Sequence, residues 1–121
     1  MSRKANDTVR NGIDCIDAHR RLLSGRRLGL VTGPTGLDRQ LRPTIDRLRE
    51  IGDLRALFSP EHGLYGEAQA GDHVASAKET RTGLPVHSLY GETRDLDPAT
   101  VGEIDLLVFV MQDIGIRYYT F

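Results

Sequence analysis

The residues that could do chemistry lie in short polar clusters, and the first pairs a carboxylate with an imidazole. Glu61 and His62 lie between Pro60 and Gly63, immediately after an apolar run. A rigid turn there would hold both side chains beyond the end of a strand, where a carboxylate with a raised pKa can donate or accept a proton. The same two residues could instead only hydrogen-bond the loop backbone. The pattern by itself leaves both interpretations open.

A second candidate group follows the most apolar segment of the chain. Gln112 and Asp113 come directly after it, and Arg117, Tyr118 and Tyr119 lie a few residues further on. Asp113 could be a second carboxylate or could anchor a substrate hydroxyl, although an aspartate in this position often only caps a turn. An arginine beside tyrosines can bind a carboxylate or a sugar, or can belong to an ordinary amphipathic segment.

Other common site chemistries find little support in the sequence. The turn at 33–36 could receive an anion on its backbone N–H groups, but it has neither the P-loop nor the dinucleotide-binding pattern. The histidines, at 19, 62, 73 and 87, lack metal-ligand spacing, and no G-x-S-x-G motif occurs. We therefore expect neither a metal nor an organic cofactor. The lone Cys15 cannot form an internal disulfide and is interpreted as a structural thiol.

Alternating apolar segments predict the elements that would position these clusters. Helical spacing or an N-terminal proline predicts helices over 9–23, 43–51 and 98–103. Apolar runs bounded by turn residues predict strands over 28–32, 54–58, 85–89 and 104–111. The segment 64–83 is polar and contains glycine, so we interpret it as a long functional loop with room for a short hairpin.

This order of elements predicts an α/β fold, a Rossmann-like parallel sheet with flanking helices. The run 104–111 is apolar on both faces, which indicates a central strand, after which the sheet would remain incomplete. Polar clusters at 32–36, 59–63, 88–91 and 112–115 each follow the carboxyl end of a predicted strand. Because ligands bind at that edge of open parallel sheets, we expect a single site built from separated segments.

Composition and charge narrow the class of protein. The chain has 121 residues, 39% hydrophobic and 27% charged, which is typical of one globular domain. Its net charge of −1 argues against a general nucleic-acid or anionic-membrane binder. No apolar run reaches the roughly 20 residues of a membrane span. Residues 1–11 lack the apolar core of a secretory signal, so we expect a cytoplasmic location, or a secreted or periplasmic one if a leader is missing.

The segment Phe58-Ser-Pro-Glu-His-Gly-Leu-Tyr-Gly66 makes the interpretation specific. It resembles the signature of a bacterial family, long known as a domain of unknown function, of exo-β-N-acetylmuramidases that release N-acetylmuramic acid from peptidoglycan fragments. Further matching motifs occur in order over about residues 13–121, at 29–36, 68–71, 82–91 and 108–120. The resemblance implies a Rossmann-like N-terminal domain, a smaller C-terminal domain and an active cleft between them.

The resemblance also implies roles for particular residues. Glu61 matches the family's proposed catalytic glutamate, acting as general acid or acid/base, and Asp113 is the available second carboxylate. The expected ligand is a peptidoglycan-derived muramyl saccharide. Four further residues are expected to bind it: His62, Gln112, Arg117 and Tyr90.

Three departures from the family pattern bear on activity. The family usually has Asn where this chain has Gly33, and Asp where it has Val110. It also runs to several hundred residues, so residues 1–121 are interpreted as a partial N-terminal domain that lacks the C-terminal domain and is inactive alone. Two alternatives remain open: a non-catalytic or degenerate sugar-binding fragment, which turnover of a β-N-acetylmuramide would exclude, and a nucleotide- or phosphate-binding α/β domain, which mononucleotide binding would favour.

Overall fold

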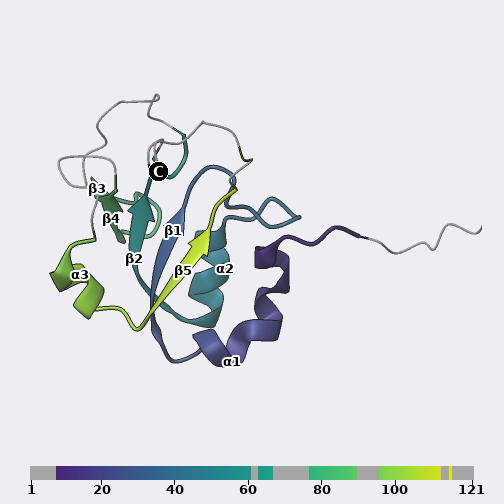
Figure 1. The fold of residues 1–121 in the computed structure, drawn as a ribbon, viewed down its shortest axis with the longest axis horizontal. Helices are drawn as coiled ribbons and strands as arrows, with labels where there is room; N and C mark the ends of the chain where they lie inside the picture. The colour runs from purple at the N-terminus through teal and green to yellow at the C-terminus, as the bar shows by residue number, and fades with distance from the viewer. Residues whose placement is uncertain (1–7, 61–62, 67–76, 90–95, 113–114, 116–121) are drawn as a thin grey trace, which may run out of the picture.

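The protein is a sheet with helices packed on it, described here from a computed structural model (Figure 1). The structure describes residues 8–60, 63–66, 77–89, 96–112 and 115. In chain order, its elements are the 3-10 helix η1 (Gly12–His19), α1 (Arg20–Leu23), β1 (Arg27–Thr32), α2 (Thr44–Ile51), β2 (Asp53–Ser59), β3 (Ala77–Lys78), β4 (Pro85–Ser88), α3 (Pro98–Gly102) and β5 (Leu106–Val110).

The strands form one sheet in the order β3-β4-β2-β1-β5. The pairs β1–β2, β1–β5 and β2–β4 are parallel, and only β3 runs antiparallel to its neighbour β4. The predicted α/β fold with a parallel sheet and flanking helices is therefore confirmed. The β3–β4 pair is a short hairpin at the end of the segment 64–83, for which the sequence left room.

Two helices begin and end at the capping residues that the sequence supplies. At α3, Asp97 Oδ2 accepts hydrogen bonds from Thr100 Oγ1 at 3.0 Å and Thr100 N at 3.2 Å, which lower the pKa of Asp97. Pro98 occupies the first turn, where no N–H is needed. At α2, the chain enters through Pro43 and leaves at Gly52. Both agree with the boundaries predicted from the sequence within one residue.

The first predicted helix is shorter and more tightly wound than its spacing suggested. It begins at Gly12 as a 3-10 helix and becomes α-helical only over Arg20–Leu23. The Asp14 carboxylate explains the start, because it accepts hydrogen bonds from Asn11 N and, across the chain, from Arg39 N, both at 2.8 Å. Val9, placed on the apolar face by the sequence pattern, lies before η1 and is 85% exposed.

The sheet separates two apolar clusters, one on each face. A bulge in β2 determines which cluster each β2 side chain belongs to. The register of β1 and β2 shifts after Leu28, so that Arg55 has no partner on β1. This extra residue reverses the alternation of β2. Leu54 and Leu57 therefore face the larger cluster, while Ala56 and Phe58 face the smaller one on the opposite side.

The larger cluster holds most of the described core and receives the helices. Its helical members come from η1, α1 and α2 (Figure 1), and Leu28, Leu30, Leu48 and Leu57 in it are fully buried. On the other face, Val31, Ala56 and Phe58 are buried, while α3 contributes no buried residue. β1 and β2 lie inside the strand order and therefore have buried side chains on both faces of the sheet.

In the described sheet, β5 lies at one side, although the sequence indicates a central strand there. In the described sheet β5 pairs only with β1 and forms the edge. Its residues alternate: Leu106, Val108 and Val110 pack on the larger cluster, while Leu107 and Phe109 are 41% and 68% exposed. The continuous apolar run does reflect two apolar faces, but no described element covers the second one.

We expect residues 1–121 to self-associate through this uncovered face. An edge strand that carries exposed apolar side chains is a template for pairing and for hydrophobic contact. Phe109→Ser should therefore shift the elution volume in size-exclusion chromatography toward that of a monomer. Val9→Ser, which removes an exposed apolar side chain that lies outside the sheet, should not. A wild-type chain that elutes as a monomer at every concentration would contradict this expectation.

Candidate functional site

The parallel strands bring their following loops to one edge of the sheet. β1, β2, β4 and β5 all run in the same direction, so the residues after each strand lie side by side at the carboxyl end. Two hydrogen bonds join the ends of neighbouring strands there: Leu89 N, just after β4, donates to Ser59 O of β2 at 2.8 Å, and Thr32 Oγ1 of β1 donates to Val110 O of β5 at 3.0 Å. The described parts of all four polar clusters therefore belong to one surface.

Only one of the six predicted site residues can be placed. Gln112 is described, directly after β5, and its side chain is exposed. The other five lie outside the described residues: Glu61, His62, Tyr90, Asp113 and Arg117. Their roles stay predictions. The described residues next to them show where the chain enters and leaves these positions.

The residues that flank Glu61 and His62 are held together. Gly63 N donates to Pro60 O at 3.3 Å, which closes the chain around the two positions between them. Gly63 has φ of +78°, a left-handed conformation that a residue with a side chain rarely adopts. Pro60 follows Ser59, whose carbonyl is already bonded to Leu89. Pro60 thus directly continues a central, buried strand.

The chain after Gly63 is anchored at three consecutive residues. Leu64 is 5% exposed and belongs to the larger apolar cluster. The Tyr65 hydroxyl donates to Glu79 Oε1 at 2.8 Å. Gly66 lies against the loop after β1, because a Cβ there would be 3.1 Å from Pro34 Cγ. Each anchor uses a different part of the fold, so this segment has little freedom to shift.

Glu79 is a buried carboxylate that the sequence pattern did not single out. It is 4% exposed, and its Oε2 accepts hydrogen bonds from Thr82 N at 2.7 Å and Thr82 Oγ1 at 2.6 Å. Burial alone would raise the pKa of Glu79, but the hydrogen bonds from Thr82 and Tyr65 outweigh it and lower the pKa to about 2. For Tyr65, burial and the bond to this carboxylate raise the pKa of the phenol.

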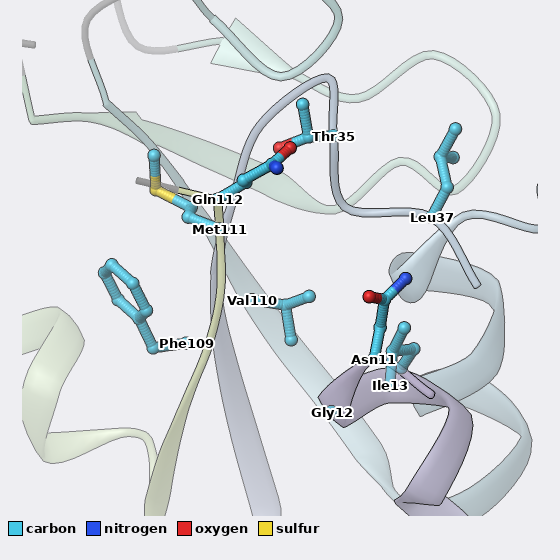
Figure 2. A pocket seen from close by; sticks show the side chains of 9 residues that line it. All are labelled: Asn11, Gly12, Ile13, Thr35, Leu37, Phe109, Val110, Met111 and Gln112. Atoms are coloured by element: carbon cyan, nitrogen blue, oxygen red, sulfur yellow. The ribbon is translucent and has the colours of Figure 1, made fainter. Parts of the chain in front are cut away.

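Gln112 lines an open pocket of about 370 Å³ at the same sheet edge (Figure 2). Its polar lining comes from Asn11 at the start of η1, Thr35 after β1 and Gln112, while Ile13, Leu37, Val110 and Met111 supply apolar surface. The Phe109 ring points to the other side of β5 in this view. Amide and hydroxyl groups of this kind suit the hydroxyl and acetamido groups of a sugar.

Val110, one of the departures from the family pattern, lies in the wall of this pocket. The aspartate that the family usually carries at this position would add a carboxylate beside Gln112. Gly33, the other departure, has open space around it, since no atom lies within 4 Å of an added Cβ. No contact therefore requires glycine at position 33, whereas Val110 packs against the larger apolar cluster.

A pair of glycine substitutions tests how the loop after β1 supports this edge. A methyl group at Gly36 would overlap Thr32 Oγ1, the atom that is bonded to Val110 O. We expect Gly36→Ala to lower the free energy of unfolding by about 1–3 kcal/mol, because an overpacked site must shift. Gly33→Ala, three residues away in open space, should change it by less than about 0.5 kcal/mol. Urea unfolding measures both, and equal effects would contradict this account of the loop.

The described residues contain no group of three His, Cys, Asp or Glu side chains placed to hold a metal ion. In the same part of the chain, no helix has the length and apolar character needed to cross a membrane.

These features define an α/β domain with a polar surface along the carboxyl edge of its sheet, and comparisons with known proteins agree with the fold. The family described as "Exo-beta-N-acetylmuramidase NamZ, N-terminal" matches residues 28–121. The chain is 44% identical over 116 residues to "Peptidoglycan beta-N-acetylmuramidase NamZ" of Bacillus subtilis, covering 93% of this chain. The chain belongs to the NamZ family and matches the N-terminal part that the family description names.

Solved structures support the same assignment. A DUF1343 family protein from Bacteroides fragilis is similar with a TM-score of 0.78 and 43% identity, over 93% of this chain. A second DUF1343 protein from that organism has a TM-score of 0.75 and 28% identity, over 95% of this chain. The chain spans 28% of the length of the Bacillus relative and 28% and 29% of the two solved chains.

Proposed function

We propose that this chain contributes the acid/base part of a glycoside hydrolase that releases terminal β-linked N-acetylmuramic acid from peptidoglycan fragments. The observation that supports it most is family membership over residues 28–121, a range that includes Glu61 and Asp113. In this proposal Glu61 protonates the glycosidic oxygen as its bond to the anomeric carbon breaks, and Asp113 is the second carboxylate. Water then supplies the new hydroxyl of the released sugar, and the proton that this water loses passes to the carboxylate that acts as base.

The proposed binding residues suit the chemistry of this sugar. N-acetylmuramic acid carries both an acetamido group and a carboxylate. The guanidinium of Arg117 is a good partner for the carboxylate, because it offers paired donors in a fork. Gln112 offers a donor and an acceptor to the acetamido group from the pocket beside β5, and His62 and Tyr90 complete the proposed set.

We further propose that turnover needs more polypeptide than residues 1–121. The chain spans 28% of the length of the Bacillus relative, and its pocket beside β5 is open to solvent. A general acid works at neutral pH only if its surroundings raise its pKa, which requires a site shielded from water. The isolated chain is therefore expected to show no muramidase turnover.

A chimera tests this function. Residues 1–121 replace the matching segment of the Bacillus relative, and turnover of a chromogenic β-N-acetylmuramide is measured for the chimera, the intact relative and residues 1–121 alone. Turnover by the chimera, with none by the isolated chain, is the expected result. A folded chimera that binds N-acetylmuramic acid without turnover would contradict the enzymatic proposal and favour a degenerate sugar-binding module.

A further inference from the structure

The Glu79 carboxylate joins three separate parts of the fold. It accepts the Tyr65 hydroxyl from the loop after β2, and it holds Thr82 within the turn of the β3–β4 hairpin. Arg81 lies 3.5 Å from Glu79 Oε1, and its Nη1 donates to Asp46 Oδ2 on α2 at 3.2 Å. The loop after β2 and the hairpin therefore meet at one buried carboxylate, and Arg81 links the hairpin to α2.

The hairpin that carries Glu79 is itself rigid. Glu79 N donates to Leu84 O at 2.8 Å, and Gly83 N donates to Glu79 O at 2.7 Å. Gly83 has φ of +72°, the left-handed conformation that this tight turn needs. The carboxylate thus has a fixed backbone, and its bond to Tyr65 transmits that fixed position to the loop.

We propose that Glu79 and Tyr65 are positioning residues for catalysis, which hold the Gly63–Gly66 segment and through it the glutamate two residues before Gly63. This inference rests on the proposed function, in which Glu61 is the general acid. Leu64 fixes the segment by apolar packing, but apolar packing sets direction less sharply than a hydrogen bond to a buried carboxylate. The network supplies that directional restraint.

The consequence is a particular kind of catalytic defect. A general acid is needed most when the leaving group is a poor one, such as a sugar hydroxyl, and least when it is a good one, such as 4-nitrophenol. A small misplacement of the acid should therefore slow hydrolysis of the saccharide far more than hydrolysis of the aryl glycoside. Partial unfolding, by contrast, lowers both rates by the same factor, because it only reduces the amount of active enzyme.

The test compares the two leaving groups in the chimera carrying Tyr65→Phe, Glu79→Gln or neither. Tyr65→Phe keeps the ring and removes only the hydroxyl. We expect kcat for a disaccharide ending in N-acetylmuramic acid to fall about 10-fold or more, and kcat for the 4-nitrophenyl glycoside to fall less than about 3-fold. Glu79→Gln should give the same pattern. Asp53→Asn, which removes a half-exposed carboxylate paired with Arg55 at the opposite end of β2, is the matched control and should change neither rate.

Equal losses on both substrates, or no loss on either, would overturn the positioning proposal. Glu61→Gln, assayed beside these variants, distinguishes failure of the positioning proposal from failure of the proposed function. If Glu61→Gln slows the saccharide selectively while Tyr65→Phe and Glu79→Gln do not, only the positioning role is wrong. If Glu61→Gln itself has no effect, Glu61 is not the acid and both proposals are wrong.

Discussion

Glu61→Gln in the chimera is expected to lower kcat for the muramyl saccharide by at least about 10²-fold, the low end of the contribution of general acid–base catalysis. Glutamine keeps the size and the hydrogen-bonding shape of the side chain but has no proton to give. The loss should therefore appear in kcat more than in KM. Steady-state release of N-acetylmuramic acid measures both quantities.

Two variants serve as controls for this result. His62→Ala should lower kcat by a smaller factor than Glu61→Gln if His62 only positions the substrate or the glutamate. Glu103→Gln removes another carboxylate, which follows α3 and lies just before the amino end of β5, away from the carboxyl ends of the strands. This variant should leave kcat unchanged. Near-normal turnover by Glu61→Gln would exclude Glu61 as the acid.

Acid is expected to destabilise the fold through Glu79. Its pKa is about 2 in the folded chain against an ordinary value of 4.5, so the folded state binds its proton less readily than the unfolded state. The stabilisation is complete above pH 4.5 and is lost as the pH falls from 4.5 toward 2. For a carboxylate this deeply buried, the shift corresponds to a loss of up to about 3 kcal/mol in the free energy of unfolding.

Urea unfolding of wild type and Glu79→Gln at a series of pH values isolates this contribution. Asp105 also has a lowered pKa, about 2, because Arg27 hydrogen-bonds it, but this exposed pair is common to both proteins and cancels in their difference. Glu79→Gln should be less stable at neutral pH and should lose less stability in acid. Parallel pH profiles for the two proteins would contradict the account of this carboxylate.

The sequence predicted the parallel sheet because its signals were local and strong. The apolar runs of β1 and β2 end at polar turns, and Asp97-Pro98 and Gly52 mark helix boundaries directly. Parallel strands then place the following clusters at one edge by topology alone. This is why Gln112 could be assigned to the carboxyl edge of the sheet from sequence, and it lies there beside β5, while its role in binding stays a prediction.

Features that depend on distant partners could not be predicted in this way. The apolar run around Leu107 and Phe109 has the composition of a central strand, and only the sheet order shows that β5 forms the edge. The bulge at Arg55 is set by pairing with β1. Glu79 stands in a polar segment without periodicity, and its role emerges only when Tyr65, fourteen positions earlier, reaches it. The one local signal is Thr82 three residues after Glu79, a spacing suited to a side chain that accepts from the turn backbone.

A crystal structure of the chimera with bound N-acetylmuramic acid tests the central claim most directly. The account predicts the sugar at the carboxyl edge of the sheet, with Gln112 and the Glu61 carboxyl within hydrogen-bonding distance of it. The carboxyls of Glu61 and Asp113 would then lie about 5–5.5 Å apart in a retaining enzyme or about 6.5–9.5 Å apart in an inverting one. A sugar bound away from this edge, or Glu61 and Asp113 on opposite edges of the sheet, would contradict the account.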